Sequence, residues 1–247
     1  MRIYEKLFIF ANQKHFRMKI NLFVSCVMDQ FYPETAKNVL RILKRVGVEV
    51  FYNPDQTCCG KVAFNAGFVD KAVEMGEKLL KDFPDDGPVV GVSASCIGYL
   101  RTHFRELFHK RRVPDVYELT EFLVRQGFLD FGASFPHKVA YHDTCSSLRE
   151  LGLKDEGRAL LSKVKGLELV EIKHPELCCG FGGMFSVQHE PVSAALAERK
   201  LNDVAESGAE YFVTNDISCL MHLDGFAKKH DVPVRVAHIA DVLSSFD

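Results

Sequence analysis

Residues 19–26 read Lys-Ile-Asn-Leu-Phe-Val-Ser-Cys, and residues 138–145 read Lys-Val-Ala-Tyr-His-Asp-Thr-Cys. Each stretch opens with a short apolar run that contains β-branched or aromatic residues, which predicts strands at 19–25 and 138–142. Each strand is followed at once, or within three residues, by a cysteine, Cys26 or Cys145. The chain therefore repeats one arrangement, a buried strand that delivers a thiol at its carboxyl end.

The eight cysteines form two sets of four with matching spacing. The first set is Cys26, Cys58, Cys59 and Cys96, and the second set is Cys145, Cys178, Cys179 and Cys219. Each member of the second set follows its counterpart by 119 to 123 residues, and both adjacent pairs are followed by glycine, Gly60 or Gly180. Agreement at four positions indicates a tandem duplication.

Strand and helix patterns alternate in both halves. In the first half we expect strands at 19–25, 48–52 and 88–93, and helices at 34–46, 69–83, 97–108 and 116–124. In the second half we expect strands at 138–142, 167–172 and 210–214, helices at 155–164, 190–207 and 219–229, and a terminal helix after residues 234–237. Such alternation is typical of βαβ units, so the predicted fold is α/β, with two tandem similar Rossmann-like halves and parallel sheets.

Domain boundaries follow from the same pattern. Residues 131–136 read Phe-Gly-Ala-Ser-Phe-Pro, a stretch typical of a connection. We therefore expect a first domain at 18–133, a second domain at 134–247, and an N-terminal extension at 1–17.

Composition excludes several classes of protein. The chain has 247 residues, 47% of them hydrophobic, and a formal net charge of −2, so it lacks the basic footprint of nucleic-acid binding. No apolar run approaches the roughly 18 residues of a membrane span. Because no secretory signal is visible, we expect a cytoplasmic protein, where eight cysteines favour metal or redox chemistry over disulfides.

Position along the strands predicts where the thiols lie. Cys26, Cys96, Cys145 and Cys219 each follow a predicted strand, and both Cys-Cys-Gly turns follow strands as well. The carboxyl edge of an open parallel sheet is where ligands bind. We therefore expect the four thiols of each half to gather at one edge, giving two clusters or one that is shared.

Thiolates are soft ligands that suit zinc, cuprous copper and iron–sulfur clusters. Neither half has the C-x-x-C pair that is usual in structural zinc sites. Adjacent cysteines suit a polynuclear cluster better, since two irons can each take one sulfur. The glycine that follows permits close backbone approach and positive φ. An iron–sulfur cluster is the favoured cofactor; zinc, a redox disulfide and simple buried thiols are the alternatives.

Two further side chains precede Cys145. His142 and Asp143 suggest either nucleophilic catalysis beside a thiol or hydrogen bonding around a cluster. We favour the second interpretation, because four thiols in register fit ligation better than a lone nucleophile.

Four segments carry a resemblance to a known family. They are residues 25–33 (SCVMDQFYP), 141–145 (YHDTC), 178–187 (CCGFGGMFSV) and 216–222 (DISCLMH). From residue 18 to 247 the chain resembles the cysteine-rich CCG domain family, which includes a component of heterodisulfide reductase and the iron–sulfur subunit of glycolate oxidase. The segments are most similar to its lactate-utilisation members. The resemblance implies an iron–sulfur subunit of a lactate-oxidising complex that works with a ferredoxin-like iron–sulfur subunit and a third lactate-utilisation subunit.

The chain departs from the fuller family motif, which closes with C-x-x-C. Tyr99 stands three residues after Cys96, and His222 stands three residues after Cys219. His222 is a candidate nitrogen ligand of the kind found in Rieske centres, whereas tyrosine is a poorer substitute. We expect the second half to hold the better metal site. Two alternative functions remain: a thiol/disulfide enzyme, which the resemblance to heterodisulfide reductase suggests, and a zinc-stabilised scaffold, which the thiol ligands allow.

Overall fold

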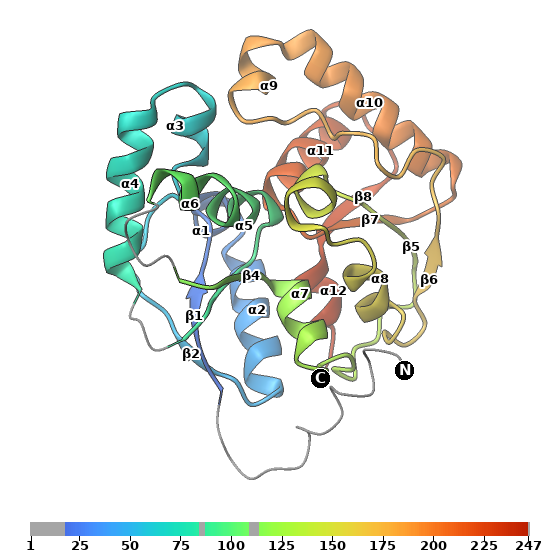
Figure 1. The fold of residues 1–247 in the computed structure, drawn as a ribbon. Helices are drawn as coiled ribbons and strands as arrows, with labels where there is room; N and C mark the ends of the chain where they lie inside the picture. The colour runs from blue at the N-terminus through green and yellow to red at the C-terminus, as the bar shows by residue number, and fades with distance from the viewer. Residues whose placement is uncertain (1–17, 84–86, 109–113, 247) are drawn as a thin grey trace, which may run out of the picture.

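The described part of the chain contains two four-stranded sheets, one from each half (Figure 1). All neighbouring strands are parallel, and the strand orders, β2-β1-β3-β4 and β6-β5-β7-β8, are equivalent. The strands are β1 (Lys19–Phe23), β2 (Glu49–Phe51), β3 (Val89–Gly91), β4 (Val116–Glu118), β5 (Lys138–Tyr141), β6 (Glu168–Val170), β7 (Tyr211–Thr214) and β8 (Arg235–His238). The prediction of an α/β fold with two similar parallel-sheet halves is confirmed.

This computed structural model describes residues 18–83, 87–108 and 114–246, so the predicted extension at 1–17 lies outside the described residues. The helices of the first half are α1 (Cys26–Phe31), α2 (Pro33–Arg45), α3 (Lys61–Asn65), α4 (Val69–Asp82), α5 (Ala94–Arg101), α6 (His103–Leu107) and α7 (Leu119–Arg125). Those of the second half are α8 (Glu156–Leu161), α9 (Met184–Gln188), α10 (Glu190–Glu206), α11 (Ile217–Lys229) and α12 (Ile239–Leu243). A π-helical turn, Ser146–Leu151, precedes α8.

Helix α2 illustrates why these segments fold as they do. Pro33 occupies the first turn, where the N–H that it lacks would have no partner within the helix. Lys44 and Arg45 lie in the last turn, where their positive charges interact favourably with the negative end of the helix dipole. Val39, Ile42 and Leu43 are buried, forming one apolar stripe. The expected helix at 34–46 is therefore confirmed.

One hydrophobic core lies between the two sheets and joins the halves. It contains Ile20 and Leu22 of β1 together with Val139 and Tyr141 of β5. Helices α2, α7, α8 and α12 also contribute side chains to it. The alternate residues of these strands, Phe23 and Ala140 among them, face two separate outer cores, as the period-2 geometry of a strand requires. Helices therefore cover both faces of each sheet.

The expectation of a helix at 116–124 was wrong in its first part. Residues 116–118 form strand β4, which pairs in parallel with β3, and helix α7 begins only at Leu119. The Glu118 side chain accepts hydrogen bonds from the backbone N–H groups of Thr120 and Glu121, which caps the helix at its first turn. Because the edge strand has only three residues and runs directly into the helix, its apolar pattern is too short to distinguish the strand from the start of the helix.

The segment at 234–237, expected to lead into the terminal helix, also contains a strand. It belongs mostly to strand β8, which pairs with β7 from Arg235 to His238. His238 then caps α12 by accepting from the Ala240 N–H. The terminal helix is present, but a fourth strand of the second sheet precedes it.

Candidate metal centre

The cysteines of each half come from three neighbouring strands of one sheet. Cys26 is the first residue of α1, directly after β1, and Cys96 lies in the first turn of α5, after β3. Cys58 and Cys59 lie in the loop between β2 and α3. Because β2, β1 and β3 are adjacent and parallel, their carboxyl ends bring these loops to one edge.

The second half repeats the arrangement. Cys145 directly precedes the π-helical turn after β5, and Cys219 lies in the first turn of α11, after β7. Cys178 and Cys179 lie in the loop between β6 and α9. The Asp216 carboxylate fixes the start of α11 by accepting from the N–H groups of Ser218 and Cys219, at 2.9 and 3.3 Å.

The Cys-Cys-Gly turn has the same backbone geometry in both halves. Gly60 has φ of 92° and Gly180 has φ of 94°, in the left-handed region that favours glycine. A Cβ at Gly180 would lie 2.5 Å from the carbonyl oxygen of Ser193, so a side chain has no room there. The Gly60 N–H donates to Cys58 Sγ at 3.5 Å, and the Gly180 N–H donates to Cys178 Sγ at 3.4 Å. The backbone thus directs a donor at a sulfur in each set.

Within each set the thiols contact one another in sequence. In the first set, Cys26 and Cys58, Cys58 and Cys59, and Cys59 and Cys96 lie close enough to shift one another's pKa. The second set follows the same order, from Cys145 through Cys178 and Cys179 to Cys219, and Cys179 Sγ lies 2.9 Å from Cys219 Sγ. The prediction that sulfurs far apart along the chain gather in each half is confirmed.

These contacts shift the acidity of the thiols. The neighbouring thiol of Cys26, followed by that of Cys59, lowers the pKa of Cys58. The pKa of Cys26 is raised because its proton is held by Cys58, and the pKa of Cys145 is raised in the same way by Cys178. Cys58 therefore ionises more readily than Cys26 and Cys59, whose pKa values are raised, and the thiolate is the form that binds a metal.

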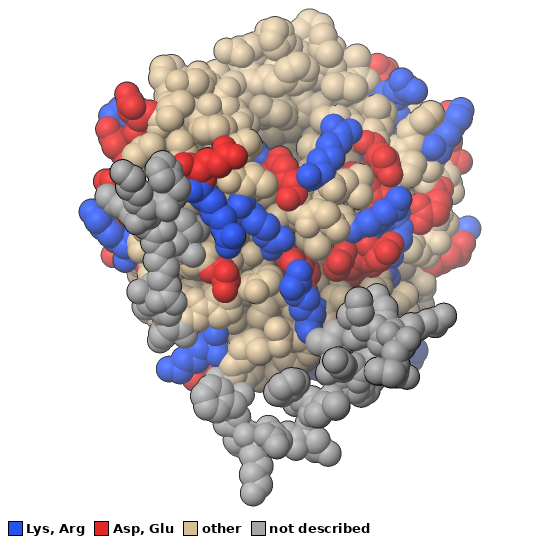
Figure 2. All heavy atoms as spheres, viewed as in Figure 1, with Lys and Arg blue, Asp and Glu red and all other residues tan. Residues whose placement is uncertain are grey.

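Both sets open onto one cleft. All eight cysteines line a cavity of about 270 Å³, whose walls also include Ser25, Lys61, Val62, Ser95, Glu150, Gly183 and Asp216. Its two sides approach closely, since a Cβ at Gly183, just before α9, would lie 4.0 Å from Val62 Cγ2 of α3. Figure 2 shows a hollow in the mainly uncharged surface at this end of the molecule, between α3 and α9 in the view of Figure 1.

The halves meet at the floor of the site through equivalent residues. Ser95 and Ser218, each directly before a cysteine, contact each other with their hydroxyl oxygens 3.5 Å apart. The Ser95 N–H donates to Asp216 Oδ2 at 2.5 Å, and the Ala94 N–H donates to the Asn215 carbonyl at 3.2 Å. The helices that carry Cys96 and Cys219 therefore start side by side.

An ion pair crosses the cleft between the halves. Lys61 Nζ lies 3.1 Å from Glu150 Oε1 and also donates to the Ser95 carbonyl and the Ser146 hydroxyl. Neither Lys61 nor Glu150 was predicted from the sequence to belong to the site. The position of Lys61 directly after Gly60 could have indicated that it lies at the site. Its pairing with Glu150 depends on how the two halves pack, so the sequence gives no sign of it.

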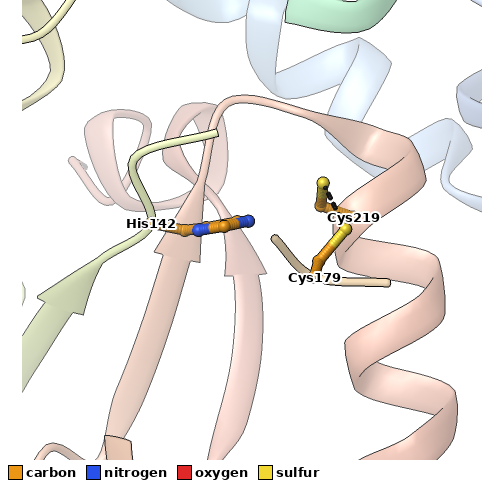
Figure 3. Close-up of side chains that lie close together, drawn as sticks. All are labelled: His142, Cys179 and Cys219. Carbon is orange, nitrogen blue, oxygen red and sulfur yellow. Dashed lines mark hydrogen bonds between the residues drawn. The ribbon is translucent and has the colours of Figure 1, made fainter. Parts of the chain in front are cut away.

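His142 lies beside the second set, and Asp143 does not. A ring nitrogen of His142 and the Sγ atoms of Cys179 and Cys219 lie within 4.8 Å of one another (Figure 3). Burial, and then the positive charge of Lys200, lower the pKa of His142 well below its usual range, so the ring is neutral. Asp143 instead forms a two-point ion pair with Arg158, at 2.6 and 2.9 Å. These two residues do not form a catalytic pair.

The residues at the closing positions of the motif differ in their placement. His222 Nε2 lies 3.2 Å from the Ser193 hydroxyl, and the ring lines a neighbouring cavity rather than the cysteine cleft. Tyr99 is fully buried, and its hydroxyl has no hydrogen-bond partner among the described residues. Burial, followed by the charges of Cys59 and Cys58, raises the pKa of Tyr99 to about 12.

Comparison with known proteins shows which family has this arrangement of cysteines. A model of the cysteine-rich (CCG) domain matches residues 20–101 and 139–224, one match in each half. The chain is 39% identical to lactate utilization protein A of Geobacillus kaustophilus over 92% of this chain and 99% of that protein. It is 38% identical to the protein of the same name from Bacillus subtilis, over 92% of this chain and all of that one. The chain belongs to the cysteine-rich CCG domain family and, within it, to the family of lactate utilization protein A.

A solved structure shares the fold. A hypothetical protein from Helicobacter pylori superposes with a TM-score of 0.63 at 9% identity, over 98% of this chain. The chain spans about half the length, 53%, of that protein. In the described part of the chain, no helix has both the length and the apolar character that crossing a membrane requires.

Proposed function

We propose that the chain is the iron–sulfur electron-transfer subunit of a system that oxidises lactate. The observation that carries the proposal is the pair of four-thiol sets at the carboxyl edges of the two sheets, both lining one cleft. The lactate assignment comes from the names of the relatives, which are lactate utilization proteins over nearly their whole length.

The donor set fits an iron–sulfur cofactor. Thiolate sulfurs are the usual ligands of such clusters, and each set provides four. In both sets a glycine without a side chain lies beside the sulfurs and its N–H points at one of them. Hydrogen bonds of this kind are one means by which a protein sets a cluster's reduction potential.

The roles of the chain's own residues follow from the geometry. Cys26, Cys58, Cys59 and Cys96 would hold one cluster, and Cys145, Cys178, Cys179 and Cys219 would hold the other. A cluster of this type takes up and releases single electrons. Buried Cys59, Cys179 and Cys219 exclude water from the inner side of the sets, whereas Cys26 is exposed.

The proposed partners are a ferredoxin-like iron–sulfur subunit and a third lactate-utilisation subunit. Oxidation of lactate itself would belong to that assembly. This chain would pass the electrons on through the two sets, which lie close enough to line the same cavity.

Anaerobic purification tests the cofactor, with iron, acid-labile sulfide and zinc measured on the same sample. We expect iron and sulfide, and an electron paramagnetic resonance signal that appears or vanishes on chemical reduction. With the partner subunits added, lactate should cause the same change, and without them it should not. Stoichiometric zinc without iron or sulfide would instead support the zinc-stabilised scaffold and contradict the proposal.

A thiol/disulfide enzyme is the second candidate, and the shared cleft favours it. Because both sets face one cavity of about 270 Å³, a small disulfide in it would meet sulfurs of both halves. Reduction of a small disulfide by the isolated, cofactor-loaded chain with a chemical electron donor would support this candidate. Absence of turnover under those conditions would favour the electron-transfer role.

A further inference from the structure

The second cysteine set has a buried histidine that no hydrogen bond accounts for. His142 directly follows β5 and is 1% exposed. Within the described part of the chain, neither Nδ1 nor Nε2 has a hydrogen-bond partner. A buried polar group left unpaired destabilises the folded state, and in native proteins it calls for a specific explanation such as an ion.

The ring is directed at the sulfurs. Figure 3 shows His142 pointing from the end of its strand toward Cys179 and Cys219. With a ring nitrogen and both Sγ atoms within 4.8 Å of one another, a small adjustment brings all three around one metal atom. A neutral imidazole is a common metal ligand, and iron–sulfur centres with mixed sulfur and nitrogen ligands are known.

Two neighbouring side chains, Asp143 and His222, already have partners of their own. Asp143 forms an ion pair with Arg158, so it does not orient the His142 ring. His222, the histidine that the motif suggested, already contacts Ser193. We propose that His142 is a nitrogen ligand of the metal centre formed by Cys145, Cys178, Cys179 and Cys219; the inference rests on the proposed function.

The two halves differ at this position. Because β1 and β5 pair with their neighbours in the same register, His142 corresponds to Phe23. Phe23 is 1% exposed and packs in an apolar core that includes Cys59. The first set therefore has an aromatic ring without nitrogen where the second has an imidazole, so the two centres are predicted to differ in ligand type.

The correspondence of His142 with Phe23 suggests the variant that tests the proposal. Substitution His142→Phe places in the second half the residue that the fold already accepts in the first. Since it removes two unpaired polar atoms, the metal-free variant should be as stable as the wild type or more so. A ring with a structural role alone would show the opposite, a loss of stability with metal content unchanged.

The decisive measurement is pulsed electron paramagnetic resonance on protein labelled with ¹⁵N-histidine. We expect the wild type to show coupling to a directly bound histidine nitrogen, and His142→Phe and His142→Gln to lose it. The control His222→Ala should keep it. Iron and sulfide content are measured alongside.

The outcomes separate the two proposals. If the wild type holds iron and sulfide but shows no bound histidine nitrogen, or if the coupling persists in His142→Phe, the inference alone is overturned. A wild type without iron and sulfide overturns the proposed function, and the inference with it.

Discussion

At the scale of single residues, the site depends on a few positions where only one residue type fits. The glycine after each cysteine pair adopts positive φ beside another backbone segment, so it permits the turn where a larger residue would collide with that segment. The halves agree at these glycines and at all eight cysteines. They differ at Phe23 and His142 and at Tyr99 and His222, which makes the two sets chemically distinct.

Substitution Gly180→Ala should destabilise the protein by more than the left-handed backbone alone explains. The control is Gly208→Ala, because Gly208 has φ of 74° and no atom within 4 Å of its Cβ position. We expect a loss of about 1–2 kcal/mol for Gly208→Ala from the backbone conformation. Gly180→Ala should lose at least about 1 kcal/mol more, because the new Cβ collides with Ser193. Equal losses in denaturant unfolding would contradict this account of the turn.

At the scale of elements, most strands and long helices were predictable because apolar periodicity and end signals agree. Helix α2 and strands β1, β5 and β7 were predicted nearly to their ends. Strand β4 was missed because three residues cannot show a period and helix α7 follows without a break. Helices α3 and α9, five residues each, were not expected, since their conformation depends on the loop around the cysteines rather than on an apolar stripe.

The junction of β4 and α7 predicts a pH effect. Burial raises the pKa of Glu118 to about 7, above the usual value of 4.5. The folded state therefore binds a proton more tightly than the unfolded state, so this residue's contribution to stability should fall as pH rises from about 4.5 to 7. The slope cannot exceed about 1.4 kcal/mol per pH unit.

The variant that tests this is Glu118→Gln, which keeps an oxygen to cap α7 and cannot ionise. The difference in free energy of unfolding between variant and wild type should shift in favour of the variant between pH 5 and 8. Urea titrations at several pH values measure it. A difference that stays constant across this range would show that Glu118 does not titrate in it.

At the scale of the whole molecule, the cleft exists because two equivalent halves pack around one core. The cysteine sets could be predicted from the repeat, since each belongs to a single sheet. Three features could not be predicted: the shared cleft, the ion pair of Lys61 with Glu150, and the lack of a hydrogen-bond partner for His142 among the described residues. They depend on how the halves and their loops pack, and no local pattern records that.

The shared core predicts that the halves unfold together. Asp241 of α12 accepts from Thr35 and Asn38 of α2 at 3.1 and 3.0 Å, and the central core draws on both sheets. Separating the domains predicted at 18–133 and 134–247 would expose this core to water. We therefore expect one cooperative transition, with far-ultraviolet circular dichroism and tyrosine fluorescence giving coincident curves. Two resolved transitions would mean that the halves are independent.

The central claim is that each half holds its own metal centre through its four thiols. Iron and acid-labile sulfide per chain, measured in anaerobically purified wild type, Cys59→Ser, Cys179→Ser and the double variant, test it most directly. We predict that each single substitution depletes iron and sulfide in part, by disrupting its own set, and that the double variant retains almost none. Iron and sulfide that are absent from the wild type, or unchanged in the double variant, would contradict the claim.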